Sequence, residues 1–253
     1  MSLNSMLIMP FLIALQFLTT IPVRLPTIPS AQQNAWSILF YPVIGTMIGG
    51  ILYAMAFYLS DLPLVLLSSL ILVVWIWLTG GLHLDGLADS ADAWVGGFGD
   101  RERTLAIMKD PACGPIGVIS IVVLCMLKWS SLYVLLQQQQ YWFLIFVPML
   151  GRLSPLFLFL TTPYVRNNGL GTQMMQYLPK KLCLLVFIVS LLFFIWIGQT
   201  LAGLLILIFL LALCYLRHKM CQRLGGMTGD TIGASVELIE MLMLLNAVLM
   251  FYT

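Results

Sequence analysis

Residues 80–117 read GGLHLDGLADSADAWVGGFGDRERTLAIMKDPACGPIG. This stretch contains one of the two histidines, His83, and six of the ten acidic residues: Asp85, Asp89, Asp92, Asp100, Glu102 and Asp110. The sequence on either side of it is strongly apolar. Because charge next to a bilayer is costly unless it has a task, we interpret this acidic stretch as a functional site.

The composition places the rest of the chain in a membrane. Of the 253 residues, 61% are hydrophobic and 9% are charged, whereas an average globular domain has about 25% charged residues. The sequence therefore predicts an all-α, polytopic membrane helix bundle in which residues 1–253 form a single domain. The basic residues are too few and too dispersed for a nucleic-acid surface, so we expect no nucleic acid partner.

Long apolar segments predict about seven membrane spans. They cover residues 36–60, 62–80, 114–136, 141–162, both halves of 182–216, and 232–252. Segment 182–216 is too long for one span and is interrupted at 198–200, which predicts a helical hairpin. Pro10 and Gln16 interrupt residues 3–21, so we expect an interfacial or re-entrant helix there, followed by a proline-broken linker at 22–35.

The acidic stretch itself predicts a helical loop between two spans. We expect a helix at 83–94, a glycine-rich turn at 96–99 and a short amphipathic helix at 101–109. With this loop in the cytoplasm, ten of the twelve basic residues fall on the cytoplasmic side, as the positive-inside rule requires. These are Arg24, Arg101, Arg103, Lys109, Arg166, Lys180, Lys181, Arg217, Lys219 and Arg223. We therefore expect the working surface to face the cytoplasm.

Three of the acids have a spacing that brings them together. At about 100° per residue, Asp85, Asp89 and Asp92 fall within an arc of roughly 60° on one helix face. Such like charges repel one another unless a cation lies between them, and Mg²⁺ takes carboxylate oxygens, water and substrate phosphate. No thiolate or imidazole cluster is nearby, which argues against zinc. The alternative, that the acids only solvate an amphipathic helix, is disfavoured because the other predicted helices carry little charge.

A second polar stretch, LGGMTGDTIGASVELIE at 224–240, opens the last span. Asp230 stands at its cytoplasmic mouth, next to Thr228 and Gly229, and the glycines here let a phosphate approach backbone N–H groups. We expect Asp230 to share a site with Asp85 and to bind the metal. The alternative is that Asp230 only caps the last span.

Ionisable residues also occur inside the predicted spans. Glu237 and Glu240 lie in the last span, where such groups usually face the bundle and mark function. The alternative is that they form a structural ion pair with Lys128 or Arg152, which lie in the predicted spans 114–136 and 141–162. His83 also has two interpretations: a proton acceptor or phosphate donor, or a helix-start residue with a satisfied ring.

Several motifs together resemble one enzyme family. Besides GGLHLDGLADSADA and RERTLAIMKD in the acidic stretch, they are FLTTIPV at 17–23, YPVIG at 41–45, NGLG at 168–171 and LGGMTGDTIGASVEL at 224–238. In this order they resemble the cobalamin synthase family, the adenosylcobinamide-GDP ribazoletransferases. The matches run from about Phe17 to Leu244 and so cover nearly the whole chain.

The resemblance implies a bacterial inner-membrane enzyme of late vitamin B12 biosynthesis. It implies transfer of the cobinamide phosphate of adenosylcobinamide-GDP to α-ribazole, or to its 5′-phosphate, with release of GMP and with Mg²⁺ as cofactor. At the positions that match the family's motif, the resemblance implies that Asp85, Asp89 and Asp92 bind the metal. We expect Asp92 or His83 to take the proton of the attacking hydroxyl. Membrane lipid is an expected partner, and the sequence leaves a homo-oligomer open.

Basic and polar residues near the acids are the expected substrate contacts. Arg101, Arg103 and Lys109 follow the acidic helix and are predicted to contact phosphate. Thr228 and Gly229 are predicted to do so from the second polar stretch.

Two other functions compete with this interpretation. A CDP-alcohol phosphotransferase also carries spaced aspartates on a membrane helix, but its motif has Ala-Arg after D-G-x-x, whereas Ala88 here is followed by Asp89. A divalent-cation transporter would need acids near the bilayer midplane in facing helices, often with an internal repeat. The main acids here are expected at the interface, and the sequence shows no repeat.

Overall fold

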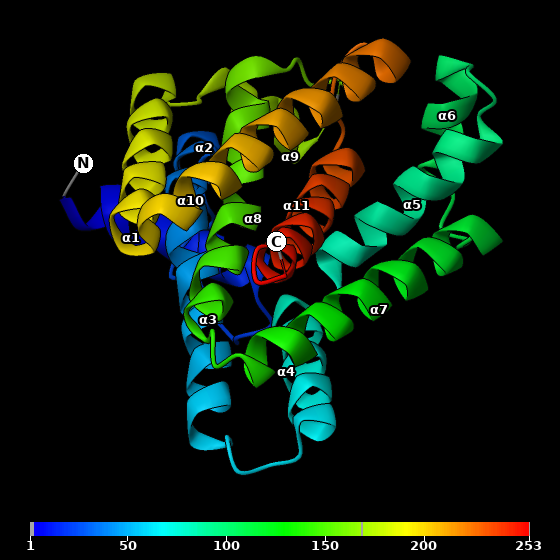
Figure 1. Cartoon of the computed structure of the whole chain (residues 1–253). Coiled ribbons are helices and arrows are strands. Elements are labelled where there is room, and N and C mark those ends of the chain that lie inside the picture. Colours follow the sequence, from blue (N-terminus) through cyan, green and yellow to red (C-terminus); the bar gives the residue numbers. More distant parts are fainter. Residues whose placement is uncertain (1–2, 168, 253) are drawn as a thin grey trace.

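The structure is a computed structural model that describes residues 3–167 and 169–252. This part of the chain is helical and contains no β-strand (Figure 1). The helices are α1 (Leu3–Leu18), α2 (Ala31–Ser37), the 3-10 helix η1 (Ile38–Phe40), α3 (Tyr41–Tyr58), α4 (Leu64–Thr79), α5 (Leu82–Gly96), α6 (Arg101–Ile107), α7 (Pro115–Gln137), α8 (Trp142–Thr161), α9 (Leu170–Gln176), α10 (Lys180–Leu224) and α11 (Gly229–Leu249).

The helix lengths confirm the prediction of a polytopic membrane bundle. Within the described residues, 6 helical segments are long and apolar enough to cross a membrane, and there are up to 7 if the bent pair α4 and α5 counts as one span. The six are Ala31–Tyr58, Pro115–Gln137, Trp142–Thr161, Lys180–Gly198, Ala202–Leu224 and Gly229–Leu249. The chain is therefore a multi-pass membrane protein.

The acidic helix α5 continues a span after a sharp bend. Helices α4 and α5 meet at 86°, because Gly80 and Gly81 between them both adopt left-handed backbone conformations, with φ of 62° and 69°. Helix α4 has 16 residues and is about 24 Å long, less than the roughly 30 Å of a bilayer core. The predicted span 62–80 is thus the first arm of a bent helix pair, and the apolar side of its second arm, α5, packs into the bundle at Leu84 and Leu87.

The predicted hairpin in 182–216 takes the form of a bent helix. Helix α10 covers 45 residues, and its two halves are separate candidate spans. Figure 1 shows it changing direction near its middle, where yellow passes into orange, so that both of its ends lie at the same end of the bundle. This is the arrangement that the two predicted spans require.

Two short helices occur where the sequence predicted only a linker and a loop. Helix α2 begins inside the predicted linker 22–35, because Ser30 and Gln33 form a capping box that starts a helix. Helix α9 lies inside the loop between α8 and α10. At the N-terminus, α1 has 16 residues with Pro10 inside it, so it is shorter than a full span.

A buried ion cluster joins α7, α8 and α11. Lys128 Nζ donates hydrogen bonds to Glu237 at 2.8 Å and to Glu240 at 2.6 Å, and Arg152 pairs with Glu240. All four side chains are buried. The structure therefore shows the structural ion pairing that was the alternative for these residues. Each buried charge is compensated by an opposite charge inside the bundle.

Candidate functional site

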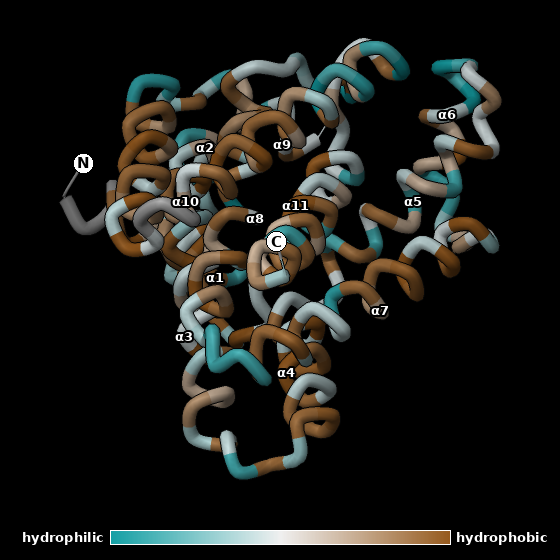
Figure 2. Tube along the Cα trace, viewed as in Figure 1, coloured by the Kyte–Doolittle hydropathy of each residue, from teal (hydrophilic) through white to brown (hydrophobic). Residues whose placement is uncertain are grey.

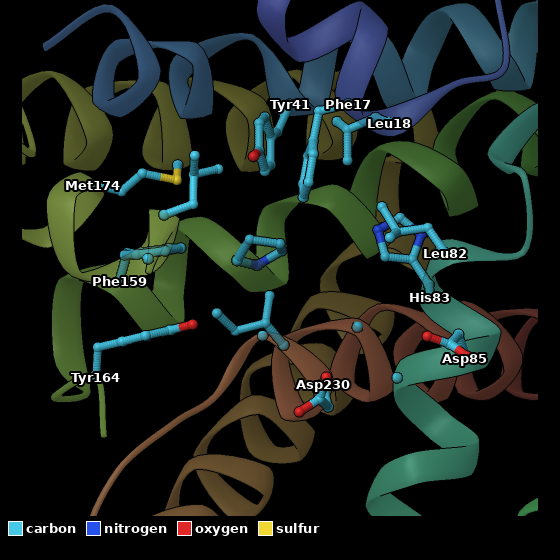
Figure 3. Close-up of a pocket in the computed structure, with 17 residues that line it drawn as sticks. Phe17, Leu18, Tyr41, Leu82, His83, Asp85, Phe159, Tyr164, Met174 and Asp230 are labelled. Carbon is cyan, nitrogen blue, oxygen red and sulfur yellow. The ribbon is translucent and has the colours of Figure 1, made fainter. Parts of the chain in front are cut away.

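A cavity of about 240 Å³ lies where the start of α5 faces the start of α11. Its walls also include residues of α1, α3, α8, α9 and the loop after α8. Figure 3 shows Asp85 and Asp230 on one side of it and the rings of Phe17 and Tyr41 on the other. The cavity therefore has an acidic wall and an aromatic, apolar wall.

The two acids meet because glycines let their helices touch. A Cβ on Gly86 of α5 would lie 2.7 Å from the carbonyl oxygen of Asp230, and one on Gly233 of α11 would lie 3.4 Å from the Cα of His83. A larger residue at position 86 would push α11 away from α5. The structure thus brings Asp85 and Asp230 to one cavity, as the sequence predicted.

The cap of α11 is Thr228 and not Asp230. The Thr228 hydroxyl accepts a hydrogen bond from Thr231 N, and the Thr231 hydroxyl accepts one from Thr228 N, which together form a capping box. Thr228 is fully buried in this role. Its predicted contact with substrate stays a prediction. The alternative in which Asp230 only caps the helix does not describe this structure, since the Asp230 carboxylate is directed elsewhere.

Asp230 pairs with Arg166, a residue that the sequence analysis did not place in the site. Arg166 Nη2 donates to Asp230 Oδ2 at 2.6 Å. The backbone of its loop is held against the start of α11, because Val165 N donates to Met227 O at 2.9 Å and Met227 N donates to Pro163 O at 2.8 Å. Its Nε is buried and has no hydrogen-bond partner within residues 3–167 and 169–252. Arg166 is thus a preorganised cation beside the acidic wall.

The sequence contained a feature that could have indicated a role for Arg166 in the site. It is a lone basic residue in the loop between two spans, two residues before the NGLG motif. In the same loop, Tyr164 lines the cavity. Burial raises the pKa of Tyr164, and the charge of Asp230 acts in the same direction. Its phenol therefore stays protonated and can donate a hydrogen bond to a ligand.

The other two predicted metal-binding acids extend away from the cavity along α5. Asp89 lies one helical turn after Asp85 on α5 and does not line the cavity. The carboxylate of Asp92 accepts hydrogen bonds from the backbone N–H groups at the start of α7: Gly114 at 2.7 Å and Gly117 at 2.9 Å.

Asp92 thereby ties the acidic helix to α7. Two hydrogen bonds occupy about half of the four acceptor positions of a carboxylate, so Asp92 can still hold a second partner. Its predicted roles as metal ligand and proton acceptor stay predictions. It does not line the cavity that contains Asp85.

The donors around the cavity fit a magnesium ion shared with a ligand. In the described chain, no three histidine, cysteine, aspartate or glutamate side chains converge to hold a metal by themselves. Mg²⁺ does not need such a cage, since it is commonly bound by one or two carboxylates together with water and substrate phosphate. Asp85 and Asp230 supply two carboxylates from two helices. The assignment of Asp85, Asp89 and Asp230 as ligands stays a prediction.

The remaining predicted residues divide into two groups. His83 and Gly229 line the cavity. His83 is 5% exposed, and its Nδ1 has no hydrogen-bond partner in the described part of the chain. The predicted phosphate contacts on the acidic loop, in contrast, lie outside the cavity. Arg101 donates to Leu224 O at 2.6 Å, Arg103 lies over the Phe98 ring at 5.0 Å, and Lys109 is exposed.

Comparison with known proteins connects this site to one family. The family model of cobalamin-5-phosphate synthase matches residues 10–249. The chain belongs to this family. The matched region contains both acids of the cavity, Asp85 and Asp230, since it spans α5 and α11.

Curated members of the synthase family are similar over almost their whole length. A protein of Acinetobacter baumannii named adenosylcobinamide-GDP ribazoletransferase is 54% identical over 244 residues, which cover 96% of this chain and 98% of that protein. Proteins of the same name from Pseudomonas fluorescens (50% over 241 residues, 95% and 99%) and Pseudomonas entomophila (47% over 242 residues, 96% and 99%) are also similar. No solved structure matches the chain.

Proposed function

We propose that this member of the cobalamin-5-phosphate synthase family is an adenosylcobinamide-GDP ribazoletransferase. It transfers the cobinamide phosphate group to α-ribazole, or to α-ribazole 5′-phosphate, and releases GMP. This step joins the nucleotide part of cobalamin to the corrinoid. The names of relatives at 47–54% identity support the activity and adenosylcobinamide-GDP as substrate.

One observation carries the chemistry: two carboxylates from different helices line one cavity, and Arg166 pairs with one of them, Asp230. Transfer of a phosphoryl group needs little covalent work from a protein and depends on positioning and on neutralising charge. Asp85 and Asp230 would hold Mg²⁺, which supplies Lewis-acid neutralisation of the pyrophosphate oxygens when bound. Arg166, next to Asp230, would orient a phosphate oxygen through its guanidinium.

The chain offers two acceptors for the proton of the attacking hydroxyl. His83 lines the cavity and has an Nδ1 without a partner in the structure's described residues. Asp92 lies outside the cavity, and its carboxylate already accepts two backbone hydrogen bonds. This arrangement favours His83 as the proton acceptor and Asp92 as the residue that fixes α5 on α7. The apolar wall around Phe17 and Phe159 would exclude water from the reacting phosphorus.

We place the enzyme in the bacterial inner membrane with this cavity towards the cytoplasm. The distribution of basic residues supports the orientation: α6 and both ends of α10, which carry most of them, lie at one end of the bundle. Figure 2 shows hydrophilic segments gathered at that end, beyond the apolar central part of the bundle. The positive-inside rule assigns such an end to the cytoplasm.

A direct assay tests the proposed function. The full chain, purified in detergent, is incubated with adenosylcobinamide-GDP and Mg²⁺ together with either α-ribazole or its 5′-phosphate. Formation of the corresponding cobamide and of GMP in equal amounts is expected for one acceptor or both. Omission of Mg²⁺ should stop the reaction. GMP without a cobamide product, or no turnover of adenosylcobinamide-GDP with either acceptor, would reject the proposal.

A further inference from the structure

A second cavity of about 450 Å³ lies on the other side of the acidic helix, between α5, α11 and the C-terminal half of α10. Helix α5 lines it with Leu87, Ser90, Ala91 and Trp94. At about 100° per residue, this face points roughly 180° away from the face of the three acids. The two cavities share no lining residue. We call this second cavity the rear crevice.

The rear crevice contains a buried hydroxyl without a partner. Ser90 is 8% exposed, and its Oγ has no hydrogen-bond partner in the part of the chain that the structure describes. Buried hydroxyls in native proteins are nearly always hydrogen-bonded. The Ser90 hydroxyl therefore indicates a polar group of a ligand at this point of an otherwise largely apolar wall.

One end of the rear crevice is cationic and aromatic. Lys219 of α10 lines it and forms no ion pair with any described residue. Its ammonium lies 5.6 Å from the ring centre of Tyr215. Trp94 is at this same end, because Arg223, one helical turn after Lys219, donates to Trp94 O at 2.9 Å. Tyrosine, tryptophan and lysine together are typical of the level of lipid headgroups.

The rear crevice also adjoins the exposed surface of a candidate membrane span, Ala202–Leu224. Leu211 and Tyr215, on the adjoining surface of α10, are 61% and 60% exposed. Leu216 and Leu238 form apolar walls further inside. A ligand that enters from this side is an amphiphile, with an apolar chain for the leucines, a polar group for Ser90 and an anion for Lys219.

We propose that the rear crevice is a binding site for an anionic phospholipid. The phosphate lies at Lys219, the ester region reaches the Ser90 hydroxyl, and an acyl chain packs along Leu87 and Leu238. A lipid bound there supports the back of α5 and so holds the acidic face towards α7 and α11. The site does not rest on the proposed transferase activity, because it uses none of the residues that line the cavity at Asp85.

The lipid retained by the protein tests the site without any assay of activity. The full chain is reconstituted into vesicles of equal parts phosphatidylglycerol and phosphatidylcholine, re-extracted in mild detergent, and its bound lipids are measured by mass spectrometry. We expect phosphatidylglycerol to be enriched over the vesicle ratio. Lys219→Gln should reduce the enrichment about fivefold, the effect of one basic residue on an anionic lipid. The control is Lys181→Gln, which replaces an exposed lysine at the start of α10. This variant should keep the enrichment of phosphatidylglycerol.

A second variant tests the crevice itself. Ala91→Leu adds apolar volume inside the rear crevice without a change of charge, so it should displace the bound lipid of both headgroup types. If Ala91→Leu does not fold, the lipid ratio of Lys219→Gln still tests the proposal. A wild-type lipid ratio equal to that of the vesicles, or equal losses in Lys219→Gln and Lys181→Gln, would overturn the proposal. Unchanged retention in a folded Ala91→Leu would overturn it as well.

Discussion

Asp230 Oδ2 and Arg166 Nη2 lie 2.6 Å apart, and this ion pair joins the start of α11 to the loop after α8. Neither side chain is fully buried, at 19% and 27% exposed. A partly exposed pair contributes little to stability by itself. Its significance is one of placement, because it holds a cation beside Asp230, which lines the same cavity as Asp85. This combination suits an anionic ligand that arrives with a divalent metal.

Replacing Arg166 should weaken substrate binding more than stability. Arg166→Gln removes one charge-assisted contact with phosphate, and such contacts contribute about 1.5–3 kcal/mol, or roughly tenfold or more in KM for adenosylcobinamide-GDP. Arg24→Gln, at an exposed position between α1 and α2, is the control. Steady-state kinetics and thermal melting in detergent measure the two effects. An unchanged KM in a folded Arg166→Gln variant would leave Arg166 with a structural role only.

Asp85→Asn should nearly abolish transfer while the protein remains folded and inserted. The amide keeps the size of the side chain but is a much poorer ligand for Mg²⁺, and loss of several kcal/mol of transition-state stabilisation corresponds to about a hundredfold or more in rate. Asp61→Asn, at the exposed end between α3 and α4, is the matched control. Wild-type turnover of Asp85→Asn at ordinary Mg²⁺ concentrations would contradict the metal assignment.

Substitutions of Asp230 and Thr228 should have different effects, because Asp230 is expected to act in the site and Thr228 caps α11. Asp230→Ser should lower turnover about a hundredfold or more with little change in melting temperature, because the carboxylate is not the cap of α11. Thr228→Val should instead destabilise the protein by about 0.5–2 kcal/mol through loss of the capping hydroxyl. Turnover and melting curves of both variants are compared. The reverse pattern would show that Asp230 serves only the fold.

Glu240 should be more important for stability than any acid of the cavity. It lies fully buried between Lys128 and Arg152, so Glu240→Gln leaves buried positive charge uncompensated, at a cost of about 3–5 kcal/mol. Thermal melting in detergent should show a larger loss for Glu240→Gln than for Asp85→Asn. Equal melting temperatures for the two variants would mean that water or lipid reaches the cluster.

The orientation can be checked by labelling. In a background without the native cysteines, Glu102→Cys on α6 and Gln222→Cys near the end of α10 are both at exposed positions at the end of the bundle that we place in the cytoplasm. A membrane-impermeant thiol reagent should label both only from the inside, and Asp61→Cys only from the outside. Labelling of Glu102→Cys and Gln222→Cys from opposite sides would refute a shared face.

Local sequence properties determined the helices and the type of site. Runs of apolar residues long enough to cross a bilayer give the spans, and their physical basis lies within each segment. The spacing of Asp85, Asp89 and Asp92 gives one acidic helix face for the same reason, because helix geometry is local. The capping box at Ser30 and Gln33 was also readable, although we predicted a linker there.

Tertiary structure decided which charges face one another. The sequence contained Arg166 and Asp230 but not their contact, which depends on how the loop after α8 packs on α11. It left open whether Glu240 was functional or structural until α7 and α8 placed two cations around it. Asp92 belongs to the acidic face by its spacing, yet its hydrogen bonds come from the start of α7. Periodicity fixes the direction of a side chain on its own helix, whereas its partner depends on long-range packing that a single sequence does not encode locally.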